Sequence, residues 1–232
     1  MSSAPSSVIA ILTGDLIGST QASPVAVEAT MAIIRDCAGS IGPRTDFTRF
    51  RGDGWQIRLV QPGDCLWACL LILARLRADE TALGCRIAVG IGDEYPTGAH
   101  DLSTAMGPAF TASGRALDQM KSGLLLTLEY PDDYPKGLAE AYRKTFKRFR
   151  KLTYTLASHM VDHWTVEQAE AMALKLDPET PADERLSNEA IARTLGITRQ
   201  AVDARLKAAD YKLLEEMVQA FLADDQDRKH PP

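Results

Sequence analysis

The sequence predicts an α+β domain followed by an all-α domain. Up to about residue 130, short apolar runs alternate with segments that have apolar residues at helical spacing, in the order β-α-β-β-α-β-α-β. The later segments are helical in pattern, and a Pro- and Asp-rich stretch at 131–135 separates the two parts. We therefore expect domains at 1–135 and 136–232, the first a ferredoxin-like or palm-type layer with its helices on one face.

The elements of the first domain follow from local pattern. A β-branched run begins at Val8, and Pro24 suits the first turn of a helix that the glycines at 39 and 42 should end. A Gly-Asp-Gly turn at 52–54 joins two strand-like runs into a hairpin. The expected elements are strands at 8–13, 85–91 and 124–128, a hairpin at 46–60, and helices at 24–37, 65–78 and 107–120.

Two acidic residues stand at the ends of these runs. Asp15 follows the first strand, and Asp53 lies in the hairpin turn. In this fold order the two ends can lie side by side. Two carboxylates beside the backbone N–H groups of a small-residue loop suit one Mg²⁺ or Mn²⁺ ion and a nucleotide. The alternative is turn chemistry alone, because Asp and Gly dominate turns.

The composition is that of an ordinary globular protein of 232 residues with a net charge of −5. No run reaches the roughly 18 apolar residues of a membrane span, and residues 1–7 lack the basic start of a secretory signal. We therefore expect a cytoplasmic protein with no membrane partner. The four cysteines lie in apolar segments and predict buried, reduced thiols rather than a zinc site.

The charge is unevenly distributed along the chain. Residues 1–135 carry 10 Lys and Arg against 15 Asp and Glu, whereas residues 136–212 carry 14 against 11. An acidic chain argues against a broad nucleic-acid footprint, so any DNA contact should come from the second half.

Four segments of the first domain resemble the motifs of class III nucleotidyl cyclases, in the same order. Residues 13–20 are similar to the first-strand metal motif, and Arg51-Gly52-Asp53-Gly54 is similar to the hairpin that carries the second metal aspartate. Residues 85–92 and 107–117 are similar to the later blocks. The resemblance implies the fold expected above.

The resemblance also implies a site. Asp15 and Asp53 would hold two metal ions, and Arg115 would stabilise charge during transfer. The nucleoside triphosphate would lie at Gly14 and on the N–H groups of four following residues: Leu16, Ile17, Gly18 and Ser19.

The chain departs from the cyclase pattern at three positions. Thr111 stands where the cyclases carry a transition-state asparagine, and a hydroxyl cannot offer a ribose the donor and acceptor of an amide. Arg49 and Thr104 stand at the two purine-reading positions, where purine cyclases use Lys and Asp. These changes favour nucleotide binding without cyclisation, or a different base.

Over its whole length the chain resembles the SatD-like family of small bacterial proteins. That family has a Gly-Asp-[Ile/Leu] start, an Arg-Gly-Asp hairpin, a Gly-Pro-Ala-Phe block and a terminal helix-turn-helix. This chain has Gly14-Asp15-Leu16, Arg51-Gly52-Asp53 and Gly107-Pro108-Ala109-Phe110. The resemblance implies a cyclase-like domain joined to a helix-turn-helix, and no particular activity.

The second domain opens with an expected helix at 136–157. Residues 143–151 carry six Lys and Arg and no acid. This run is either a solvated face or, through Lys147 and Arg148, a contact to DNA phosphates. A capped helix at 165–176 and a closing helix at 211–221 are also expected. The apolar side of the helix at 136–157 should consist of Phe146, Phe149, Leu152 and Leu156.

Residues 186–207 have helix-turn-helix spacing. Ser187 and Thr198 suit the N-caps of two helices, Gly196 suits the left-handed turn between them, and Ala192 is small enough for a close crossing. The alternative to a DNA-binding motif is a protein–protein or dimer module. The residues suited to reading a major groove are Thr198, Arg199, Gln200, Asp203 and Lys207.

The first functional hypothesis is a homodimeric bacterial DNA-binding transcriptional regulator. Its cyclase-like domain would bind a nucleotide, a divalent metal ion or both. The alternative is a metal-dependent nucleotidyl cyclase or transferase with an appended helix-turn-helix. Thr111 favours binding over turnover.

Overall fold

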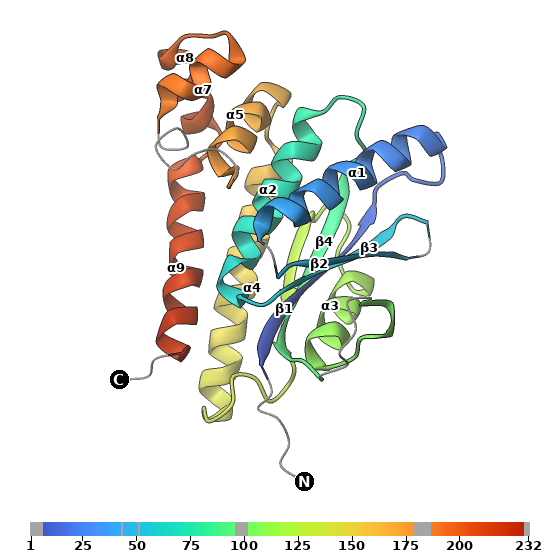
Figure 1. Ribbon diagram of the computed structural model, residues 1–232. Coiled ribbons are helices and arrows are strands. Elements are labelled where there is room, and N and C mark those ends of the chain that lie inside the picture. The colour runs from blue at the N-terminus through green and yellow to red at the C-terminus, as the bar shows by residue number, and fades with distance from the viewer. Residues whose placement is uncertain (1–6, 43, 51, 96–101, 179–186, 230–232) are drawn as a thin grey trace.

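A computed structural model describes residues 7–42, 44–50, 52–95, 102–178 and 187–229 (Figure 1). One five-stranded sheet has the order β2-β3-β1-β4-β5, with β5 parallel to β4 and the other neighbours antiparallel. The mixed α+β fold and the order of its elements are therefore confirmed. The strands are β1 (Val8–Leu16), β2 (Asp46–Phe50), β3 (Gly54–Leu59), β4 (Cys85–Asp93) and β5 (Leu126–Glu129).

Strand β1 is buried on both of its faces. Its even-numbered residues, such as Leu12, join the main core, and Ile9 and Ile11 join a smaller core on the other side. Helices α1 (Pro24–Ile41) and α2 (Cys65–Ala78) cover the first side, and α3 (Pro108–Asp118) covers the second (Figure 1). The expectation that the helices lie on one face is wrong, because both sides of β1 are apolar and each needs a cover.

Several boundaries differ from the expected ones. Helix α1 continues through Gly39, because a single glycine in a helix costs only about 1 kcal/mol, and it ends at Ile41 with Gly42 as its C-cap. Strand β4 is two residues longer than expected. Arg51 of the expected hairpin motif lies outside the described residues.

Helix α3 lies directly against β4. A Cβ atom on Gly90 would overlap the carbonyl oxygen of Ala109 and lie 2.5 Å from the backbone nitrogen of Ser113. The same contact brings the hydroxyl of Ser113 to 2.8 Å from the hydroxyl of Thr13 on β1. The glycine therefore sets the distance between helix and sheet.

The later helices form the helical part of the chain, residues 140–229. The indole of Trp67 on α2 donates to the carbonyl of Leu176 at 3.0 Å, and Arg77 donates to the carbonyl of Trp164 at 2.9 Å. One continuous core joins residues from both sides of the predicted boundary at 135. The described helices of this part are α4 (Glu140–Asp162), α5 (Val166–Leu176), α7 (Asn188–Leu195), α8 (Arg199–Ala208) and α9 (Tyr211–Lys229). In the sheet part, short 3₁₀ turns span Pro62–Asp64 and Leu102–Thr104.

Helix α4 packs with a different face from the one expected. Of its expected apolar side, Phe146 packs against the core, whereas the other three residues are exposed. Arg150, expected on a basic surface, is only 7% exposed. Its guanidinium lies 3.4 Å from the ring centroid of Phe221 and 2.9 Å from the carboxylate of Asp224, both on α9. These partners on α9 turn the arginine side of α4 inward.

The four cysteines are buried thiols, as expected. Burial raises the pKa of both the Cys37 and the Cys65 thiols to about 11. None of the described helices combines the length and apolar character needed to cross a membrane.

The contact at Gly90 generates a stability prediction. Gly90→Ala should lower the free energy of unfolding by about 2–3 kcal/mol, because the new methyl group meets backbone atoms that cannot rotate away. Gly114→Ala on α3 is the matched control, since nothing lies within 4 Å of its added Cβ, and it should raise the free energy by about 0.4–1 kcal/mol. Denaturant unfolding of the full chain measures both. Equal stability of the two variants would contradict this account of the helix–sheet contact.

Candidate functional site

Asp15 and Asp53 lie at the same end of the sheet, and each has a partner within the chain. In the register of β1 and β3, Gly14 lies opposite Trp55, so Asp15 is next to the hairpin turn. The Asp15 carboxylate accepts a hydrogen bond from Nε of Arg86 at 2.9 Å and another from Nη2. Asp53 accepts a hydrogen bond from the hydroxyl of Ser19. The sheet therefore brings the two acidic segments together and neutralises Asp15 internally.

Arg86 is the site residue that the sequence reasoning missed. It lies directly opposite Asp15 in the antiparallel pairing of β1 and β4. The carboxylate of Asp15 raises the pKa of the Arg86 guanidinium through their hydrogen bonds. A sequence shows both strands but not their register, so only the paired strands reveal this ion pair.

The donor atoms at this end of the sheet suit a hard cation, but their arrangement does not hold one. Two carboxylates suffice for Mg²⁺ where water and phosphate oxygens complete the coordination. Here the guanidinium of Arg86 engages both oxygens of Asp15, so a cation would have to displace it. Among the described residues, no group of three His, Cys, Asp or Glu side chains is placed to hold a metal ion.

The loop after β1 is a pair of turns rather than the start of a helix. The amide of Ile17 donates to the carbonyl of Gly84 at 2.8 Å, and Gly18 takes a φ of 75°. Helix α1 begins only at Pro24, with Ser23 as its N-cap. Residues 16–19 therefore lack the helix dipole that favours phosphate at a helix N-terminus.

The residues expected to contact the nucleotide are not gathered at one site in the folded structure. Arg49 binds Glu28 of α1 at 2.7 Å, on the side of the sheet opposite to Asp15. Thr111 and Arg115 lie one turn apart on α3 and line a cavity of about 620 Å³, whose described lining includes neither candidate metal aspartate. Thr104 is exposed in the Leu102–Thr104 turn.

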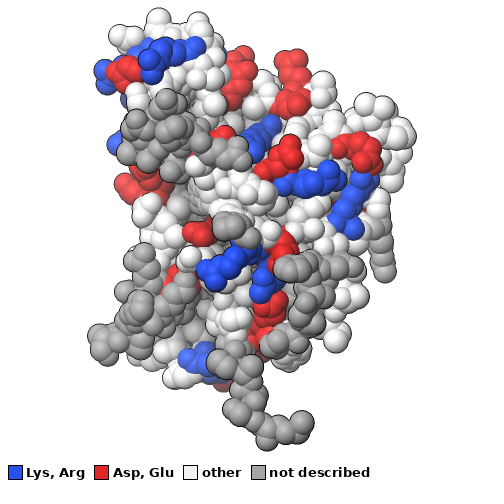
Figure 2. Space-filling model, in the orientation of Figure 1, with Lys and Arg blue, Asp and Glu red and all other residues white. Residues whose placement is uncertain are grey.

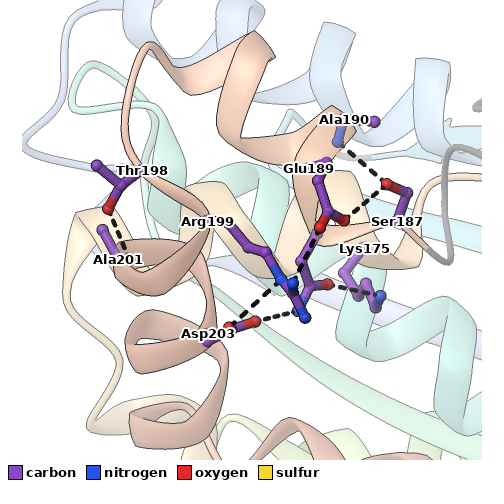
Figure 3. Close-up of polar contacts among 9 residues, drawn as sticks. Lys175, Ser187, Glu189, Ala190, Thr198, Arg199, Ala201 and Asp203 are labelled. Carbon is purple, nitrogen blue, oxygen red and sulfur yellow. Dashed lines mark hydrogen bonds and ion pairs between the residues drawn. The ribbon is translucent and has the colours of Figure 1, made fainter.

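Helices α5, α7 and α8 form a three-helix unit with the expected turn. Gly196 ends α7 in the left-handed conformation, with φ 65° and ψ 28°. The Ser187 and Thr198 side chains accept hydrogen bonds from backbone amides in the first turns of α7 and α8 (Figure 3). Val202 and Leu206 of α8 are buried. Thus the local signals for two capped helices joined by a glycine turn are confirmed.

One face of α8 is exposed, and part of it is held by a polar network (Figure 3). Arg199 lies 3.2 Å from Glu189 and 3.8 Å from Asp203. The amide of Asn188 donates to Asp203 at 2.6 Å. Two further members of the predicted reading face, Gln200 and Lys207, are exposed and have no side-chain hydrogen bond or ion pair to another described residue.

The comparisons with known proteins are sparse. No protein-family model and no curated protein matches the chain. Among solved structures, the chain is similar to a bacterial light-regulated adenylyl cyclase, with 18% identity and a TM-score of 0.40. The match covers 53% of this chain and 43% of the cyclase chain, less than half of the latter. This level of likeness carries no functional conclusion.

The basic run on α4 lies far from α8. The nitrogen of Lys147 donates to the carbonyls of Pro131 and Asp132, which ties it to the loop after β5. Burial lowers the pKa of this ammonium group. Arg148 is exposed in the same half of the helix. In Figure 1 the N-terminal half of α4 lies at the lower end of the molecule and α8 at the upper end.

The charges on the face seen in Figure 2 are mixed. Basic and acidic residues lie next to one another, including over the α7–α8 region at the top. A sequence-independent attraction to DNA phosphates would therefore be small on this face.

Proposed function

We propose that the chain is a DNA-binding protein that inserts α8 into the major groove of a duplex. The observation that carries this proposal is the α7–Gly196–α8 geometry, packed on α5 with one face of α8 exposed. In the helix-turn-helix motif the second helix enters the groove and its N-terminal residues contact base edges.

The exposed residues of α8 have the chemistry for base contacts. Arg199 can donate two hydrogen bonds to guanine, and Gln200 can donate to and accept from adenine. Asp203 can accept from cytosine, and Asn188 already fixes its carboxylate. The ion pairs of Arg199 are exposed, so exchanging them for a base costs little.

The mixed charges favour a specific mode of binding. Acidic side chains stand among the cations of α7 and α8, and two of them pair with Arg199. The net attraction to phosphates is therefore small, and the affinity would fall only modestly with salt. Sequence recognition would then depend on base contacts more than on the backbone.

Selection from random duplexes should enrich one motif for the full chain. Arg199→Ala and Gln200→Ala should each weaken binding to that motif by about 1–3 kcal/mol and relax the preference at one base position, because each removes a base contact. Arg44 is an exposed arginine in the sheet part of the chain. Arg44→Ala is therefore the matched control and should bind the selected DNA as the wild type does. Fluorescence anisotropy at several salt concentrations measures these effects. Absence of any enriched motif, together with no binding at low salt, would refute the proposal.

A second candidate function is supported by the adjacent acidic segments. We propose that the end of the sheet at Asp15 and Asp53 binds a divalent cation, with or without a nucleotide, when Arg86 is displaced. Arg86 then competes with the cation for the same carboxylate oxygens. Catalytic turnover by this site, as a cyclase or transferase, is the alternative.

The competition predicts a variant with stronger cation binding. Arg86→Gln should increase the rise in melting temperature that Mn²⁺ produces, because two uncompensated carboxylates repel each other until a cation binds. Asp15→Asn in the same background should abolish that rise. Arg44→Gln is the control and should respond as the wild type does. The measurement is thermal unfolding with and without Mn²⁺, followed by the same titration with a nucleoside triphosphate.

Two results would change this reading. If Mn²⁺ shifts neither the wild type nor Arg86→Gln, then Asp15 and Asp53 are structural residues. If the wild type cyclises ATP or GTP at an ordinary enzymatic rate and Asp15→Asn does not, then the enzyme alternative displaces the binding role. We expect turnover to be slow or absent, because Thr111 cannot offer the donor and acceptor of an asparagine amide.

A further inference from the structure

A line of apolar side chains runs along the solvent side of α4. Tyr142, Phe149, Leu152 and Leu156 are 72%, 60%, 48% and 48% exposed. The opposite side of the same helix, with Tyr154 and its neighbours, packs on the core. Helix α4 therefore has two apolar faces, and the described residues of the chain cover only one of them. Large apolar side chains gathered on one exposed face mark an interaction surface.

The spacing of the exposed residues specifies the kind of partner. Together with Thr145 and His159, which are also exposed, they lie three and four positions apart in alternation over about two and a half heptads. This is the spacing of a coiled-coil seam. A seam of this period is filled by another helix with the same period, whose side chains fit between its own. The residues of this α4 seam are Tyr142, Thr145, Phe149, Leu152, Leu156 and His159, all exposed.

We propose that the α4 seam pairs with the α4 seam of a second copy of the chain, with the two helices antiparallel. A two-fold axis between residues 150 and 151 places Phe149 against Leu152 of the partner subunit. The same axis places Thr145 against Leu156 of the partner subunit. The seam is therefore self-complementary, as the interface of a two-fold dimer must be. This proposal does not rest on DNA or cation binding.

Charge decides the direction of the helices. The open flank of the seam carries Lys144 and Arg148 in its N-terminal half and Lys151 at its centre, whereas its C-terminal half carries Asp162. Parallel helices would bring the two cationic halves together. Antiparallel helices place each cationic half beside the partner's C-terminal half. In this register Lys144 lies opposite residue 157 of the partner subunit and comes closest to Asp162 of the partner subunit, so this pair favours the antiparallel direction.

The length of the seam sets the strength of the dimer. Helix α4 has 23 residues and is about 34 Å long, and the seam supplies six side chains from each copy. An interface of one helix pair lies at the small end of stable protein interfaces. The dimer should therefore form and dissociate within an experimentally accessible range of concentration.

Sedimentation velocity of the full chain over a wide concentration range tests the interface. The wild type should pass from monomer to dimer. Phe149→Glu with Leu152→Glu should weaken the dimer by about a hundredfold or more, because both residues lie at its centre. Leu213→Glu on α9, which replaces a leucine that is 46% exposed, should leave the dimer unchanged. A wild type that stays monomeric, or a double variant that dimerises like the wild type, would overturn the proposal.

Cysteine crosslinking tests the direction of the helices. Thr145→Cys with Leu156→Cys should form a disulfide-linked dimer on mild oxidation, because the antiparallel register brings these positions together. Thr145→Cys alone should not, because its two copies lie at opposite ends of the seam. The native cysteines are buried and give little background. Efficient crosslinking of the single variant would show parallel helices and overturn the antiparallel register.

Discussion

Helix α2 is apolar around its whole circumference, and much of the structure follows from the need to cover it. Ten of its 14 residues are buried. The sheet and α1 cover part of it, and α4, α5 and α9 cover the rest. A helix without a polar face has no stable position at the surface, so the helical part must dock on the sheet part. This contact fixes the position of α5, and α5 in turn supports α7 and α8.

The shared core links the two candidate sites physically. Beside the C-terminal end of α2, Ile17 from the loop after β1 and Trp164 before α5 line the same cavity of about 560 Å³. The indole of Trp164 donates to the carbonyl of Ala209, at the end of α8. A change at the sheet end near Asp15 would therefore act beside the contacts that hold the helix-turn-helix in place. An antiparallel α4 pair would carry the two α8 helices toward opposite ends of a dimer.

Local features of the structure could be predicted from the sequence, and pairings between distant segments could not. Gly196 and the hydroxyl caps determine their own turns, so the sequence predicts two capped helices joined by a glycine turn. The partner of Asp15 could not be, because strand register is set by the whole sheet. The apolar residues of α4 predicted a packing face. In the structure α4 instead buries Arg150 against α9 and leaves Phe149 exposed. Periodicity shows that a face is apolar, not what covers it.

The central claim is that α8 enters the major groove of DNA. Photo-crosslinking from position 200 of α8 to a selected duplex tests it most directly, with the same probe at position 44 as the reference. The account predicts that the probe at position 200 crosslinks to bases of the selected motif and that the probe at position 44 does not. Crosslinks to DNA from position 44 alone, or none from position 200 to a bound duplex, would contradict it.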